Sequence, residues 1–251
     1  MRIDVLTLFP EAMQPYLAAS ILGRAQRAGL LELHTHQLRD FSQDSHRKVD
    51  DRPFGGGPGM VLGCQPIVDA VEAVEALDPR LALRVLPTPQ GRVFDQPTAA
   101  SFARRERLLF ICGHYEGYDE RIVGILRPVE VSLGDFILTG GELAALAMID
   151  AAARLVPGVL GHAEGAADES FQQGRLEHPQ YTRPREFRGQ SAPDVLISGN
   201  HAEIAAWRRA EAERRTRTRR PDLSDSENDR ILHDARGAVR VPTANMESEA
   251  H

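Results

Sequence analysis

Cysteine, long hydrophobic runs and an excess of positive charge are all scarce in this chain, and each shortage argues against a class of protein. The two cysteines among 251 residues, Cys64 and Cys112, form neither a disulfide framework nor a metal-binding spacing, so we expect both to be buried small side chains. The most apolar stretch is interrupted by Asp150 and Arg154, and the N-terminus has no apolar signal core. We therefore expect no membrane segment and a cytoplasmic location.

The composition is that of a soluble globular protein. Hydrophobic residues make up 42% and charged residues 26% of the chain, which is long enough for one large domain or for one domain with a small companion. A formal net charge of −6 argues mildly against a nucleic-acid-binding protein. The average hides an uneven distribution, which leaves that class open.

Positive charge is concentrated near the C-terminal end. Residues 200–220 contain seven arginines and three glutamates, a local excess of four positive charges. Asn200 followed by Glu203 resembles a capping box, so we expect a helix that begins there and carries Trp207 and the arginines. Two interpretations are open, namely a solvated helix face and a surface that binds a phosphate backbone.

Short β-like runs alternate with helix-like runs over the first 160 or so residues. Strands are predicted over 3–9, 31–38, 81–86, 108–112 and 129–133, and helices over 16–28, 67–77, 96–105 and 142–156. This alternation predicts an α/β domain with a largely parallel sheet. We expect this domain to span 1–160, followed by a linker over 161–176, a helical domain over 177–236 and a flexible tail over 237–251.

Ligands of open α/β sheets usually bind beyond the carboxyl ends of the strands, so the loops after the predicted strands are the places to look for a site. Three of these loops offer accessible backbone, over 87–91, 113–121 and 134–141. The last contains a double glycine and leads directly into an apolar helix, which is typical of either a plain turn or a ligand site. No Walker A or G-x-G-x-x-G spacing is present, which disfavours a phosphate-cradling NTPase and a dinucleotide fold.

Six segments carry a more specific signal. They are Val49–Met60, Cys112–Gly117, Gly134–Glu142, Pro157–Gly161, Tyr181–Pro184 and Leu196–His201. In this order and spacing they resemble the bacterial tRNA (guanine-N1)-methyltransferases of the TrmD type, in the SPOUT superfamily. The resemblance covers residues 1 to about 223.

The resemblance implies an enzyme that transfers the methyl group of S-adenosylmethionine to N1 of the tRNA guanine immediately 3′ of the anticodon. It also implies the SPOUT fold, an α/β fold with a largely parallel sheet and a C-terminal trefoil knot, plus a small helical C-terminal domain. General rules of chain topology would not predict a knot. In the family the three loops form the knot and bind the cofactor. The matching residues are Leu86, Pro87, Thr88, Pro89, Gly113, Tyr115, Glu116, Leu133, Gly134, Asp135, Phe136, Ile137, Leu138, Gly140 and Gly141.

Methylation of N1 has two chemical requirements. Neutral guanine carries a proton on N1 that a general base removes, and a cationic donor best stabilises the negative charge that develops on O6. The resemblance implies that Arg154 is the donor, although an ion pair with Asp150 would also explain it. It places the base directly before Ser170, where the family has Asp and this chain has Glu169.

The extra methylene of Glu169 matters because a misplacement of about 1 Å can cost roughly a hundredfold in rate. Three interpretations are open: Glu169 is the base, Asp168 replaces it by a one-residue shift, or the chain is impaired. We favour Glu169 because the length of the linker and the carboxylate chemistry are unchanged.

The resemblance also implies a homodimer, whose active site combines the knot of one subunit with the linker and helical domain of the other, and a dependence on a divalent ion such as Mg²⁺. No His, Cys and carboxylate cluster has the spacing of a metal site, so we expect substrate or cofactor to hold any magnesium. Contacts to tRNA are expected from His46, Asp50, Arg52, Asn200, His201, Arg208, Arg209, Arg214 and Arg215. The first three residues would equally serve to order their loop. The rival functions are a non-catalytic RNA-binding homologue and a SPOUT methyltransferase with another RNA target.

Overall fold

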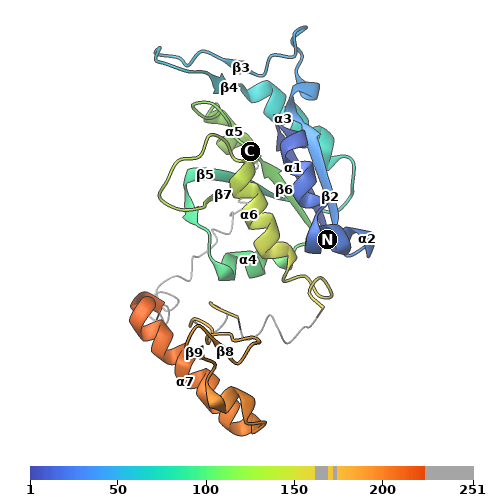
Figure 1. Cartoon of the computed structure of the whole chain (residues 1–251). Helices are drawn as coiled ribbons and strands as arrows, with labels where there is room; N and C mark the ends of the chain where they lie inside the picture. Colours follow the sequence, from blue (N-terminus) through green and yellow to red (C-terminus); the bar gives the residue numbers. More distant parts are fainter. Residues whose placement is uncertain (162–168, 172–173, 224–251) are drawn as a thin grey trace, which may run out of the picture. The chain divides into compact units, whose positions relative to one another are not determined.

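The computed structural model describes residues 1–161, 169–171 and 174–223 (Figure 1). The chain divides into two compact units, unit 1 over Met1–Ala166 and unit 2 over Ala167–His251. The boundary lies inside the segment predicted to be a linker. Among the described residues, no helix has the length and apolar character needed to cross a membrane.

A five-stranded sheet forms the centre of unit 1, with the strand order β2-β1-β6-β5-β7 (Figure 1). The strands are β1 (Arg2–Thr7), β2 (Glu32–Gln37), β5 (Leu83–Val93), β6 (Arg107–Ile111) and β7 (Val129–Ser132). Every pair of neighbours in this sheet runs parallel, which confirms the predicted α/β class. The carboxyl ends of β5, β6 and β7 therefore lie at one edge of the sheet.

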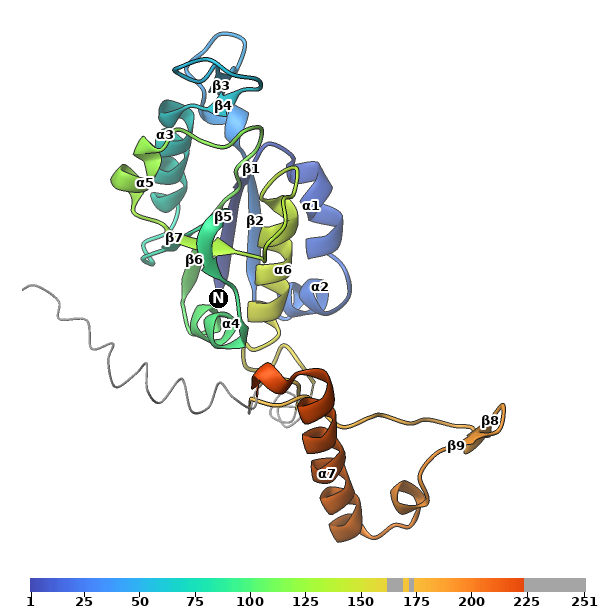
Figure 2. The same ribbon diagram turned by 90° about the vertical axis from the view of Figure 1, so that its left-hand side faces the viewer.

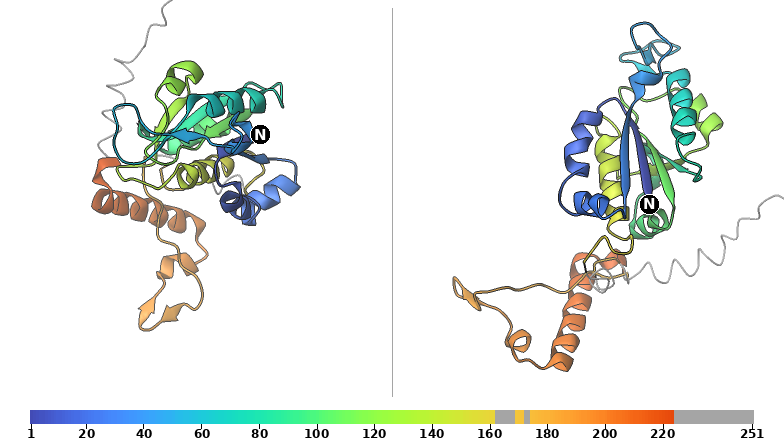
Figure 3. Two further views of the ribbon diagram at one scale, coloured as in Figure 1. Left: turned by 90° about the horizontal axis from the view of Figure 1, so that it is seen from above. Right: turned by 90° about the vertical axis from the view of Figure 1, so that its right-hand side faces the viewer.

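Helices cover both faces of this sheet (Figure 2 and Figure 3). One hydrophobic cluster joins it to α1 (Pro10–Leu17), α2 (Ser20–Arg27), α4 (Gln96–Ala103) and α6 (Glu142–Ala153). A second cluster joins the other face to α3 (Cys64–Glu75) and α5 (Arg121–Leu126). Strand β6 supplies alternate residues to the two clusters, which explains why its sequence is continuously apolar.

The helix predicted over 16–28 is in fact two helices, α1 and α2, which are separated at Ala18 and Ala19. The chain turns sharply at this break, where Ser20 adopts a φ of 44°. A Cβ atom on Gly23 would lie 2.0 Å from the carbonyl oxygen of Ala18, so this turn requires glycine. Pro10 is at the first turn of α1, where proline is favoured, and it marks a helix start earlier than the predicted residue 16.

The segment 87–91 is also not the loop that the sequence predicts, because β5 continues through it. The pairing of β5 with β7 shifts between Pro87 and Arg92, so residues 88–91 form a bulge inside a long strand. Gly91 makes this possible, since a Cβ atom there would lie 2.3 Å from the backbone nitrogen of Val131.

Several short elements were not predicted, namely α5, η1 (Leu38–Phe41), the ribbon β3–β4 (Asp50–Asp51 and Val61–Leu62) and the hairpin β8–β9 (Glu186–Phe187 and Gln190–Ser191). Cys112 is buried as expected, whereas Cys64 is half-buried at the start of α3. Both strands of each ribbon have two residues, which is too short for a sequence pattern to show.

Unit 2 is organised around α7 (His201–Arg219), with η3 (Asp194–Ile197) preceding it. The side chain of Asn200 caps α7 by accepting hydrogen bonds from the backbone nitrogens of Ala202 and Glu203 at 3.2 and 3.4 Å, which confirms the predicted helix start. Near the other end of α7, the backbone nitrogen of Leu176 donates to Thr216 Oγ1 at 2.9 Å.

Candidate functional site

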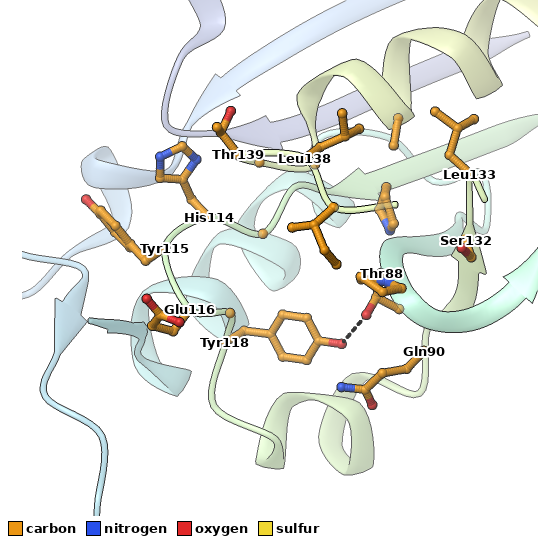
Figure 4. A pocket seen from close by; sticks show the side chains of 18 of the residues that line it. Thr88, Gln90, His114, Tyr115, Glu116, Tyr118, Ser132, Leu133, Leu138 and Thr139 are labelled. Atoms are coloured by element: carbon orange, nitrogen blue, oxygen red, sulfur yellow. Dashed lines mark hydrogen bonds between the residues drawn. The ribbon is translucent and has the colours of Figure 1, made fainter. Parts of the chain in front are cut away.

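A cavity of about 360 Å³ lies at the carboxyl ends of β5, β6 and β7 (Figure 4). Its walls are the bulge of β5 at 87–90, the loop after β6 at 113–120, and the segment over 132–141 that leads into α6. This volume is within the range of sites for small molecules and cofactors. The structure therefore brings together the three segments that the sequence singled out.

Most of the predicted cofactor residues line this cavity. They are Pro87, Thr88, Pro89, Gly113, Tyr115, Glu116, Leu133, Gly134, Phe136, Ile137, Leu138, Gly140 and Gly141. Leu86 is instead fully buried in the core with α3, and Asp135 is exposed outside the lining. Sequence reasoning did not include Gln90, His114, Gly117, Tyr118, Glu120, Ser132, Thr139 and Ala144, all of which are adjacent or close to predicted residues.

Close backbone contacts hold the loop after β6 against the start of α6. The backbone nitrogen of Gly141 donates to the carbonyl oxygen of Gly113 at 2.8 Å, and His114 and Gly140 form an antiparallel bridge. A Cβ atom on Gly141 would lie 3.0 Å from Cα of Cys112, so a larger residue would push these segments apart. The double glycine is therefore needed for packing as well as for access to a ligand.

Two tyrosines of the loop after β6 form side-chain hydrogen bonds to other segments of unit 1. Tyr118 donates from its hydroxyl to Thr88 Oγ1 at 3.3 Å, a contact that joins this loop to the bulge of β5 (Figure 4). Burial of the ring raises the pKa of Tyr118, which keeps its hydroxyl protonated as a donor. Tyr115 has a φ of 60° and accepts a hydrogen bond from Arg39 Nη2 at 3.3 Å.

The charge of the cavity is negative. Glu116 and Glu120 are among its lining residues, and the lining includes no Lys or Arg from the described part of the chain. Such a wall favours a neutral or cationic ligand over a phosphate. Nδ1 of His114 is buried here without a hydrogen-bond partner among the described residues, so the wall retains unused polar capacity.

The ribbon β3–β4 is joined to the same loop. Backbone nitrogens of Glu116 and Leu62 donate to carbonyl oxygens of Met60 and Gly117 at 3.0 and 2.9 Å. Asp50 lies in β3, while Arg52 and His46 are exposed on the adjoining segments. The structure thus connects these three predicted RNA contacts to the wall of the cavity.

Arg154, one of the three predicted catalytic residues, does not line the cavity of its own chain. Arg154 follows the last residue of α6, whereas the cavity borders the first, so about 18 Å of helix separates the two ends. Asp150 lies beside the Tyr16 hydroxyl, and its negative charge raises the pKa of Tyr16. Glu169 is half-buried in unit 2, and Asp168 lies outside the described residues.

The predicted RNA contacts of unit 2 lie on or beside α7. Arg208, Arg209 and Arg214 are exposed, Arg215 is half-buried, and His201 is the exposed first residue of the helix. The side chain of Asn200 caps the first turn of α7, as the capping-box pattern predicts. Throughout the described ranges, no group of three or more His, Cys, Asp or Glu side chains is arranged to bind a metal ion.

The structure is that of a parallel α/β protein with a cavity of small-molecule size at the carboxyl edge of its sheet. The sequence model of the tRNA (Guanine-1)-methyltransferase TrmD family matches residues 1–226, and the chain therefore belongs to this family. Similar proteins include one from Dehalococcoides mccartyi, 54% identical over 238 residues, and one from Rhodopirellula baltica, 53% identical over 226 residues. These alignments cover 93% and 89% of this chain and 96% and 93% of the relatives.

A third relative, from Citrifermentans bemidjiense, is 50% identical over 254 residues, and the alignment covers 100% of both chains. All three relatives carry the name tRNA (guanine-N(1)-)-methyltransferase. The similarity thus extends through both units.

Proposed function

We propose that this protein transfers the methyl group of S-adenosylmethionine to N1 of the tRNA guanine immediately 3′ of the anticodon. The observation that carries the proposal is the cavity, because two of its walls contain Cys112–Gly117 and Gly134–Glu142, two of the segments through which the chain resembles the family. Membership of a methyltransferase family requires a methyl donor, and the cavity is the described site that suits one.

The chemistry of the cavity supports S-adenosylmethionine as that donor. Leu133 and Leu138 provide apolar walls for an adenine ring, and the glycines expose backbone groups that can hydrogen-bond its edge. Glu116 and Glu120 provide negative charge for a ligand that carries sulfonium and ammonium groups. When bound, the donor supplies an electrophilic methyl group.

We further propose that this part of unit 1 is the trefoil knot of the SPOUT fold. Strand β5 contacts β7 both before and after the bulge, so the chain passes the same neighbour twice. The close approach of Gly91 to Val131 supports a tightly threaded arrangement.

The remaining catalytic roles fall to Glu169 and Arg154. The carboxylate of Glu169 removes the proton from N1 of guanine, which makes N1 nucleophilic. The guanidinium of Arg154 donates hydrogen bonds to O6, where negative charge develops as that proton leaves. Exposed Arg52 and the arginines of α7 are proposed to hold the tRNA backbone.

A homodimer would complete this site. Arg154 is at the far end of α6 from the cavity of its own chain, so a second copy with an antiparallel α6 would bring its arginine to this cavity. Exposed apolar side chains support such an interface: Leu143 on α6 is 62% exposed, and Tyr16 on α1 is 49% exposed.

The test is to incubate the protein with S-adenosylmethionine, Mg²⁺ and a tRNA transcript that has guanine 3′ of the anticodon, then to analyse the digested nucleosides by mass spectrometry. We expect 1-methylguanine at that nucleotide, and we expect a chelator to reduce its formation. A transcript with adenine at the same position is the control. Donor binding without any methylation would favour a non-catalytic RNA-binding homologue, and methylation elsewhere would favour another RNA target.

A further inference from the structure

Unit 2 holds an aromatic cluster that the catalytic proposal does not use. It consists of His178, Tyr181 and Trp207, and we refer to it as the aromatic cluster. The ring centroid of Trp207 lies 6.3 Å from that of Tyr181 and 6.5 Å from that of His178. The ring planes meet at 56° and 59°, so the three rings are tilted and do not form a closed stack.

The aromatic cluster is at the surface of unit 2. Tyr181 is 50% exposed, and the other two rings are half-buried. Of the described residues in unit 2, the sole fully buried apolar residue is Ala212. The described part of unit 2 therefore has very little hydrophobic core, and half of the Tyr181 side chain is open to a ligand.

Positive charge lies beside the aromatic cluster. Arg214 is on the same side of α7 as Trp207, two turns further along, and forms an ion pair with Glu211 at 2.7 Å. The pKa of Arg214 is raised, first by its hydrogen bonds to Glu211 and also by the nearby Tyr181 hydroxyl. Arg208 and Arg209 are exposed on the helix immediately after Trp207. Flat rings on a helix that also carries exposed guanidinium groups are typical of surfaces that bind unpaired nucleotides.

The hydrogen bonding of His178 provides a further polar contact point. Its Nδ1 lies 3.2 Å from the carbonyl oxygen of Pro179, and because a carbonyl oxygen only accepts, Nδ1 is the donor in this hydrogen bond. In the neutral ring with this tautomer, Nε2 is an acceptor. An exocyclic amino group of a nucleobase is a suitable donor to this nitrogen. The aromatic cluster therefore offers stacking and one edge contact, next to charges that suit a phosphate backbone.

We propose that the aromatic cluster is a stacking site for an unpaired base of the RNA substrate. This inference rests on the proposed function in that it takes tRNA as the RNA. It differs from a purely electrostatic role of α7, because stacking requires a base that is free of a duplex.

The experiment uses the full-length protein and the fluorescence of Trp207, the single tryptophan of the chain. We would titrate it with three probes: an anticodon stem-loop RNA, a duplex RNA of the same length, and inorganic polyphosphate. We expect the stem-loop RNA to quench the emission at least about twofold more strongly than either other probe, since only it offers unpaired bases. Equal responses to all three, or none to the stem-loop RNA, would overturn the proposal.

Variants test the same proposal by affinity. Tyr181→Ala should weaken binding of the stem-loop RNA between about fivefold and a hundredfold, while Tyr181→Phe should bind like the wild type because it keeps the ring. Phe187→Ala is the matched control, because Phe187 is another exposed aromatic residue of unit 2, and it should leave the affinity unchanged. A normal affinity for Tyr181→Ala, or an equal loss for Phe187→Ala, would refute a specific stacking role.

Circular dichroism would verify that the helix content of each variant is unchanged. The quenching of the unmodified protein needs no variant, so it tests the proposal even if Tyr181→Ala misfolds. Methyl transfer to the stem-loop RNA, measured on the same sample, separates the two proposals. Methylation without quenching would overturn the stacking site and leave the proposed function standing. Quenching without methylation would support the stacking site and count against the proposed function.

Discussion

Asp4 is fully buried in β1 and holds the amino end of the sheet together. Its carboxylate accepts hydrogen bonds from Arg107 Nε at 3.0 Å and from Arg2 Nη2 at 2.8 Å, and Arg107 is also fully buried. Replacement of Asp4 by Asn would leave a buried guanidinium without its counter-charge. We expect Asp4→Asn to lower the free energy of unfolding by about 3–5 kcal/mol. Urea unfolding followed by far-ultraviolet circular dichroism would measure this.

The control is Asp40→Asn, because Asp40 pairs with Arg47 at 3.1 Å while both side chains are more than half exposed. We expect a change within about 0.5 kcal/mol for this variant. Equal losses from the two variants would show that burial of the Asp4–Arg107 pair has no special weight.

Asp4 also predicts a dependence of stability on pH. Burial alone would raise the pKa of Asp4, but hydrogen bonds from His36, Arg2 and Arg107 outweigh burial and hold it well below its usual value. Because the pKa is lower in the folded protein, this stabilisation is present above the unfolded pKa of about 4 and is lost as the pH falls further. The free energy of unfolding should thus decline more steeply with acidification in the wild type than in Asp4→Asn.

Glu169 is the proposed general base, and it stands where the resemblance to the family leads us to expect Asp. Loss of a general base typically costs about 10²–10⁴ in rate, so we expect a loss of this size in single-turnover methyl transfer by Glu169→Ala. Asp168→Ala is the control and should react at the wild-type rate, while Glu169→Asp should remain active. Wild-type rates for Glu169→Ala together with a slow Asp168→Ala protein would assign the base to Asp168.

At the scale of elements, the strands and the position of the site could be predicted from the sequence. Leu108–Ile111 in β6 is apolar throughout because both faces of the sheet are covered. Two walls of the cavity follow β6 and β7, and the third is the bulge within β5. The break between α1 and α2 and the bulge of β5 could not be predicted. The bulge depends on a close approach of Gly91 to Val131, which is distant in sequence and comes near only when β5 packs against β7. The break depends on a close local approach of Gly23 to Ala18, which hydrophobic periodicity does not show.

Gly91 tests that account of the bulge. A Cβ atom there would lie within 2.4 Å of backbone atoms of Glu130 and Val131, which cannot rotate away as a side chain can. We expect Gly91→Ala to separate β5 from β7, to lower stability by about 1–3 kcal/mol and to weaken binding of S-adenosylmethionine at the adjacent cavity. Urea unfolding and titration calorimetry would measure the two effects.

Gly124 is the matched control, because it lies inside α5 with no neighbouring atom within 4 Å of an added Cβ. Gly124→Ala should be neutral or should stabilise the protein by up to about 1 kcal/mol, with unchanged donor binding. If Gly91→Ala behaved in the same way, the bulge would not depend on glycine.

At the scale of the whole molecule, neither the proposed knot nor the proposed dimer follows from local patterns. Periodicity predicts which runs form strands, but the double pass of β5 along β7 depends on the order in which distant segments are packed. The distance of Arg154 from the cavity follows from the length of α6, which the sequence predicts, but a single chain does not show what would bring an arginine to the cavity. This distance makes the proposed dimer testable.

Mixed dimers provide that test. One copy would carry Leu138→Trp, which fills the cavity, and the other Glu169→Ala, which removes the proposed base; two affinity tags would allow the mixed dimer to be purified. If each site combines the cavity of one copy with the base of the other, one of the two sites is intact, and we expect about half of the wild-type rate. If each chain holds a complete site, the mixed dimer should be inactive.

The reciprocal arrangement places both substitutions in one copy and pairs it with a wild-type copy. A shared site predicts that this dimer is inactive, because each of its sites then receives one defective half. Independent sites predict about half of the wild-type rate, since the unmodified copy would act alone. The two mixed dimers have the same composition and the same two substitutions, so opposite activities would identify which copy supplies the base, without any dependence on their relative stability.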